Sequence, residues 1–123
     1  MKNVLLLLTL ICSASFAAEP KDQTPIEVAH LVAYLETSGC EFNRNGSWYS
    51  PEKAVEHIDR KYRYLVKRGL VDSAEQFIDR AASRSSMSGR SYLVKCGEAE
   101  SVESSAWFTD ELQRFRAARQ QDS

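Results

Sequence analysis

The chain has 123 residues, of which 43% are hydrophobic, with 16 Lys and Arg against 17 Asp and Glu and a formal net charge of −1. That length suits one small domain. The balanced charge excludes the strongly basic surface typical of proteins that bind nucleic acids, so we expect no nucleic acid among the partners.

The N-terminus predicts export. Lys2 precedes an apolar run over residues 4–12, and small residues follow as far as Ala17. This order is typical of a secretory signal peptide, so we predict a signal peptide over residues 1–17, cleaved after Ala17, and a periplasmic mature protein. An uncleaved anchor is the alternative, but a membrane-spanning helix needs about 20 apolar residues. We therefore expect no transmembrane anchor after processing.

Residues 18–24 are polar and predict a disordered leader, which makes residues 25–119 a single folded domain. Thr24 and Pro25 are typical of an N-cap followed by proline in the first helical turn, and a glycine at position 39 is a natural helix end. A first helix is therefore expected over residues 25–38, with most of its surface buried because apolar residues occupy most of it.

The next segment predicts a β-hairpin. Asn45-Gly46 between β-forming residues is the strongest short-range signal for a two-residue turn, because both turn positions need positive φ. Such a turn pairs residues 42–44 with residues 47–49. Alternation along the strands then directs Phe42 toward the core and leaves Trp48 on the less buried face.

The rest of the chain predicts three more helices and one more strand. Helices are expected over residues 51–68, 72–82 and 105–119, of which the first begins with Ser-Pro and the second with a capping-box pattern. Residues 92–96 alternate as a strand does, residues 97–104 form a polar loop, and residues 120–123 form a frayed tail. The sum is an α+β domain, in which a three-stranded antiparallel sheet (the hairpin plus one strand) packs against about four helices.

Cys40 and Cys96 remain when the predicted signal peptide, with Cys12, is removed. An even pair of cysteines in an oxidising compartment predicts a disulfide, and the strand patterns direct both side chains toward the core. A redox pair and a metal site are the alternatives. Redox pairs usually have a close Cys-x-x-Cys spacing, and two cysteines without a clustered His or Asp make a weak metal site, so we expect a structural bond and no metal or cofactor.

Four stretches of the sequence are distinctive: SGCEFNRNGSWYS, AVEHIDRKYRYL, SAEQFIDRAASRSSMSGRSYLVKC and AWFTDELQRFR. They resemble a family of small exported bacterial proteins of unknown function, to which the YfeK-type proteins of enteric bacteria are distantly related. The family pattern includes residues 44–46, His57, Lys61 and residues 83–92, all of which are present here. The resemblance implies an exported protein with this fold, and it implies no activity.

Residues 83–91, which we call the serine loop, contain a candidate anion site. Ser86, Ser88 and Arg90 offer hydroxyl, backbone and guanidinium donors that suit a carboxylate or a phosphate. The alternative is a helix end whose carbonyls and turn are satisfied by the nearby hydroxyls.

His57 and Lys61 lie one helical turn apart on the second predicted helix and face the same way. Together with Arg44 and Asn45 at the tip of the hairpin, they extend the candidate ligand site. The alternative for His57 is a boundary histidine hydrogen-bonded to the hairpin or the serine loop. Trp48 is a candidate interaction patch with Arg44, because Trp and Arg are favoured interface residues, unless it packs under a loop or the last helix.

These residues predict a non-enzymatic binding or interaction module of the cell envelope, whose partner is an envelope protein or an anionic cell-wall or lipid group. The alternative is a small hydrolase in which His57 activates a serine of the serine loop. Neither a nucleophile-elbow motif nor a serine-lysine acylation motif accompanies those serines, so we assign no catalytic residue.

Overall fold

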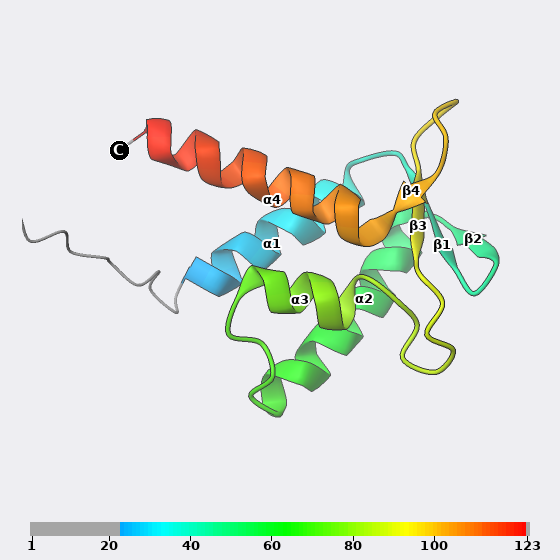
Figure 1. The fold of residues 1–123 in the computed structure, drawn as a ribbon, viewed down its shortest axis with the longest axis horizontal. Helices are drawn as coiled ribbons and strands as arrows, with labels where there is room; N and C mark the ends of the chain where they lie inside the picture. Colours follow the sequence, from blue (N-terminus) through cyan, green and yellow to red (C-terminus); the bar gives the residue numbers. More distant parts are fainter. Residues whose placement is uncertain (1–22, 123) are drawn as a thin grey trace, which may run out of the picture.

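The computed structural model describes residues 23–122 (Figure 1). The predicted signal peptide, its cleavage site, Cys12 and residues 18–22 of the predicted leader lie outside these residues. The elements in chain order are α1 (Gln23–Glu36), β1 (Glu41–Arg44), β2 (Ser47–Tyr49), α2 (Pro51–Lys67), α3 (Ala74–Ala81), β3 (Leu93–Lys95), β4 (Val102–Glu103) and α4 (Ser104–Gln121). The predicted α+β class is confirmed.

The hairpin of β1 and β2 has the predicted register. Phe42 pairs with Tyr49 and Arg44 with Ser47. The turn residues Asn45 and Gly46 have φ angles of 52° and 84°, as a turn with positive φ at both positions requires. The local chemistry of the turn therefore sets the pairing of these two strands.

The sheet has four strands in the order β2-β1-β3-β4, all antiparallel, so the prediction of three strands was wrong by one. The additional strand is β4, within the segment predicted as a polar loop, and it pairs Val102 with Val94 and Glu103 with Leu93. Both residues of β4 are exposed. A two-residue exposed strand has no alternating pattern, so nothing in the local sequence distinguishes it from a loop.

The sequence signals for the starts of α2 and α3 correspond to side-chain caps in the structure. Ser50 Oγ accepts a hydrogen bond from the Lys53 N–H at 3.3 Å, and Ser73 Oγ accepts one from the Gln76 N–H at 3.1 Å. These bonds satisfy backbone donors that have no partner within the helix.

Two predicted boundaries need correction. α1 begins at Gln23, and the Thr24 hydroxyl is buried and donates to the Asp72 carbonyl at 3.0 Å, so the predicted leader ends too late. α4 begins at Ser104 and continues to Gln121, so the last helix takes up part of the predicted tail.

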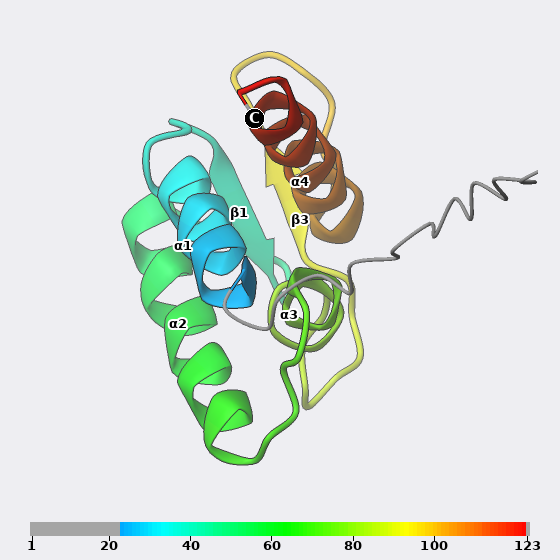
Figure 2. The same cartoon turned by 90° about the vertical axis from the view of Figure 1, so that its left-hand side faces the viewer.

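The strands gather at one end of the helices, and the C-terminal end of α4 lies at the other (Figure 1). Turned by 90°, the molecule shows α4 beside β3, with α1 and α2 together on the side of β1 (Figure 2). Between them lies the core, in which the Phe77 ring meets the rings of Tyr62 and Phe108, and the Phe42 ring lies 5.1 Å from that of Tyr92. The Tyr92 ring also lies edge-on to His57 of α2, 6.0 Å away, which positions this end of the sheet against α2.

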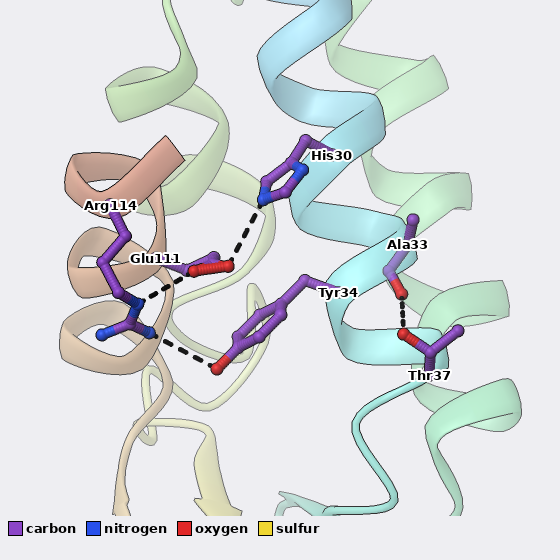
Figure 3. A network of polar contacts seen from close by, with 6 residues as sticks. All are labelled: His30, Ala33, Tyr34, Thr37, Glu111 and Arg114. Atoms are coloured by element: carbon purple, nitrogen blue, oxygen red, sulfur yellow. Dashed lines mark hydrogen bonds and ion pairs between the residues drawn. The ribbon is translucent and has the colours of Figure 1, made fainter. Parts of the chain in front are cut away.

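A polar layer joins α1 to α4 (Figure 3). His30 and Tyr34 of α1 point toward α4, where His30 Nε2 lies 3.3 Å from the Glu111 carboxylate and Arg114 donates to both Glu111 and the Tyr34 hydroxyl. The His30 ring also stacks on Phe115 at 3.9 Å. These hydrogen bonds and the stacked rings hold α1 against α4.

The disulfide between Cys40 and Cys96 is present, with the two Cα atoms 4.3 Å apart. The pairing of Glu41 with Lys95 puts these cysteines opposite each other at the end of β1 and β3. The bond therefore joins the two central strands. None of the helices within residues 23–122 has the length and apolar character needed to cross a membrane.

Candidate functional site

Four polar side chains meet where the hairpin, α2 and the start of β3 come together. Arg44 ends β1, His57 and Lys61 lie one turn apart on α2, and Tyr92 immediately precedes β3. We call these four residues the donor cluster. Tyr92 is only 1% exposed, so its hydroxyl must find its hydrogen-bond partners inside the protein.

His57 is the centre of the donor cluster. Its Nδ1 lies against Nη1 of Arg44, and its Nε2 lies 3.0 Å from the Tyr92 hydroxyl. A guanidinium group has no acceptor, so Arg44 must donate and Nδ1 must accept. His57 is therefore a neutral imidazole that carries its proton on Nε2 and donates it to Tyr92.

The surroundings of His57 favour this neutral form. Burial, followed by the nearby charges of Arg44, Lys61 and Arg60, lowers the pKa of His57 to about 4. The imidazole is thus uncharged at neutral pH, and its one lone pair is directed at Arg44. The positive charge of the cluster comes from Arg44 and Lys61.

Lys61 closes the donor cluster from the other side. Its ammonium group donates to the Arg84 carbonyl at 2.9 Å and to the Tyr92 hydroxyl at 3.2 Å. Burial, then the charges of Arg84 and Arg44, lowers the pKa of Lys61. An ammonium group has three N–H donors, so one remains after these two bonds.

The serine loop docks on the tip of the hairpin through Asn45. The Asn45 amide donates to Ser85 Oγ at 3.4 Å, and the Ser88 hydroxyl donates to Asn45 Oδ1 at 2.6 Å. The buried Ser85 Oγ also accepts from the backbone N–H groups of Met87 and Ser88, each at 3.3 Å. Ser85 thus organises the loop, and Asn45 holds it against the turn.

A depression of about 400 Å³ lies between the hairpin, α2 and the serine loop. Its lining consists of Arg44, Asn45, His57, Lys61, Ser85, Ser86, Met87 and Tyr92. Among the described residues, no Asp or Glu lines it. We call this depression the head site.

Five of the predicted ligand-binding residues line the head site: Arg44, Asn45, His57, Lys61 and Ser86. Ser88 does not line the head site and instead donates to Asn45. The Arg90 guanidinium lies over the hairpin turn instead, where a Cβ added to Gly46 would be 3.7 Å from its Nη1. The structure thus brings most of the predicted residues together, and whether they bind a ligand stays a prediction.

Comparison with known proteins identifies the family. Residues 22–116 match the family described as "Family of unknown function (DUF5329)". The chain belongs to this family. It is 39% identical over 89 residues to the uncharacterized protein YfeK of Salmonella typhimurium, an alignment that covers 72% of this chain and 70% of YfeK. No solved structure matches the chain.

The predicted family resemblance is therefore confirmed, and the region that matches DUF5329 contains the whole donor cluster. DUF5329 brings no activity with it, so chemistry must come from the residues themselves. Within residues 23–122, no three His, Cys, Asp or Glu side chains gather closely enough to hold a metal ion.

Sequence analysis missed the role of Tyr92 and Ser85. The Tyr92 ring packs in the core beside Phe42, but its hydroxyl reaches His57 and Lys61. A tyrosine on a buried face is a usable signal, because its hydroxyl needs a partner. Trp48 is 42% exposed and lies outside the lining of the head site.

The geometry gives little support to the hydrolase alternative. The lone pair of His57 faces Arg44, and its proton goes to Tyr92, so in the described contacts neither nitrogen is directed at a serine hydroxyl. A base with a pKa of about 4 is also weak at neutral pH.

Proposed function

We propose that this protein is a non-enzymatic binding module of the cell envelope, and that the head site takes up an anionic group. The observation that carries the proposal is that cations and hydrogen-bond donors gather in the head site, while no acidic side chain is among the described residues that line it. Within the described residues, no carboxylate lies within ion-pair distance of Arg44 or Lys61, and the two cations share Tyr92 and His57 as neighbours.

Several hydrogen-bond donors of the head site remain available after the contacts described above. They include one N–H of Lys61 and the guanidinium N–H groups of Arg44 that do not face His57. The almost wholly buried Tyr92 hydroxyl accepts from both His57 and Lys61 and so positions these two donors. A carboxylate or a phosphate supplies the acceptors and the negative charge that this arrangement lacks.

Titration with inorganic phosphate, sulfate and acetate tests the proposal, with the amide signals of Asn45 and Ser86 followed by NMR. We expect saturable shifts in the wild type. Lys61→Met should weaken binding about tenfold or more, because a hydrogen bond to a charged group contributes about 1.5–3 kcal/mol. Lys67→Met is the matched control on the same helix, since Lys67 is exposed and does not line the head site.

Two results would refute the anion site. One is the absence of saturable shifts with all three anions. The other is equal affinity in wild type and Lys61→Met, with urea denaturation showing that both proteins are folded.

The location in the envelope rests on the predicted signal peptide and on the disulfide, which is typical of oxidising compartments. Mass spectrometry of protein from a periplasmic fraction tests it. We expect a mature chain that begins at Ala18 with Cys40 and Cys96 bonded. Recovery of the chain only from the cytoplasm, with residues 1–17 still attached, would contradict the proposed location.

A further inference from the structure

A second depression, of about 300 Å³, opens beside the head site along α2. It is lined by His57, Arg60, Lys61, Tyr64, Leu65, Arg80 and Ser86, and we call it the chain site. His57, Lys61 and Ser86 line both depressions, so the two are contiguous. Each has the size of a small-ligand pocket, for which about 300 Å³ is the lower end of the usual range.

The chain site offers hydrocarbon although several cations line it. Arg80 Nη1 donates to the Leu70 carbonyl at 2.5 Å, so a backbone acceptor already engages its charged end. Tyr64 is 55% exposed, and beside it Leu65 is half-buried. Long basic side chains commonly cover apolar surface with their methylene stems while their charged ends lie elsewhere.

Lys61 lines both depressions. Both hydrogen bonds of its ammonium group go to residues beside the head site, the Arg84 carbonyl and the Tyr92 hydroxyl. Its methylene stem is then the part left for the chain site. One side chain therefore presents charge to one depression and hydrocarbon to the next.

We infer that the ligand of this site is a small amphiphilic anion, a carboxylate or phosphate joined to an aliphatic chain, with the anionic group in the head site and the chain in the chain site. The inference rests on the proposed anion binding and adds the chemical class of the ligand. A simple anion fills only the head site, whereas an alkyl chain attached to it also covers the part of Tyr64 that the Arg68 guanidinium, 4.5 Å from the ring centroid, leaves exposed.

A chain-length series provides the test, with acetate, butanoate, hexanoate and octanoate titrated below their micelle concentrations. Burying one methylene is worth about 0.8 kcal/mol, or about fourfold in affinity, and an open groove yields less, so we expect about twofold to fourfold per methylene. Octyl phosphate is titrated beside octanoate. The tighter binder of the two shows whether the head site prefers a phosphate or a carboxylate.

Two variants separate the parts of the site. Tyr64→Ser should abolish most of the gain with chain length and leave acetate affinity unchanged, and it is expected to fold because Tyr64 is exposed. Val66→Ser is its control, since Val66 is 49% exposed on the same helix and does not line the chain site. Lys61→Met should weaken every member of the series.

Failure of this inference differs from failure of the proposed function. Acetate and phosphate binding with no gain from acetate to octanoate would overturn the amphiphilic ligand and leave the anion site standing. A gain that survives in Tyr64→Ser would also overturn it. Lack of binding by every anion in the series would overturn both.

Discussion

Removal of the disulfide should reduce the free energy of unfolding by a large fraction. Cys40 and Cys96 are 56 positions apart, and closing a loop of that length lowers the entropy of the unfolded chain by an amount worth roughly 4 kcal/mol. Small domains have total stabilities of about 5–15 kcal/mol. The folded state should change little, because the pairing of β1 with β3 already sets the two residues opposite each other.

Urea denaturation at pH 7 measures this loss in three samples: the oxidised wild type, the wild type with reductant, and the Cys40→Ala/Cys96→Ala variant. For a domain of this size, roughly 4 kcal/mol corresponds to a fall in Tm of about 15–30 °C. The slope of the free energy with urea concentration should increase, because an unfolded chain without the cross-link exposes more surface.

The reduced wild type separates the cross-link from packing, because it keeps both sulfur atoms while the alanine variant removes them. Cys40 is buried, so the alanine variant should be the less stable of the two. A loss of less than about 1 kcal/mol on reduction would show that the restricted unfolded chain is not the main source of stabilisation.

Three further predictions concern single residues. His57 has a pKa of about 4 in the folded protein, against 6.5 for the ordinary side chain, so between pH 6.5 and 4 mainly the unfolded chain takes up a proton at this residue. The free energy of unfolding should therefore fall as the pH is lowered from 6.5 to 4, and urea denaturation of His57→Gln should show a shallower fall. Ser104→Ala should cost about 1–3 kcal/mol, because the fully buried Ser104 hydroxyl donates to the Ala82 carbonyl at 2.7 Å; a neutral effect in thermal unfolding would contradict this bond. Arg116→Met should lower the free energy of unfolding by about 3–5 kcal/mol, because the buried Glu27 carboxylate loses the guanidinium that donates two hydrogen bonds to it. If the unpaired charge is the cause, adding Glu27→Gln should recover part of that loss in the same urea denaturation.

Local chemistry explains which parts of the fold were predictable. The Asn45-Gly46 turn sets its own backbone angles and hence the register of β1 and β2. Ser50 and Ser73 cap helices through bonds to residues three positions later in the chain. Such interactions depend on a few adjacent residues, so the sequence alone indicates them.

The parts that were missed depend on contacts between distant residues. β4 exists because Val102 meets Val94, and nothing in its own two residues indicates a strand. In the head site, most of the lining residues were candidates from the sequence, but their mutual contacts were not predictable. The chain has many exposed cations, and only the fold shows that Lys61 reaches the Tyr92 hydroxyl and Arg44 reaches His57, while Arg90 lies over the turn.

The charge pattern of the donor cluster favours a role beyond folding. A buried tyrosine hydroxyl is satisfied by one neutral partner, yet Tyr92 receives both the His57 N–H and the Lys61 ammonium, with Arg44 behind the histidine. Burial of Lys61, and after it the charges of Arg84 and Arg44, lowers the pKa of Lys61, so holding this ammonium group charged in the cluster costs stability. A carboxylate in the lining would offset that cost if the cluster only stabilised the fold. With none among the described residues of the lining, the anion that we propose would supply the compensation, and its binding would stabilise the folded protein.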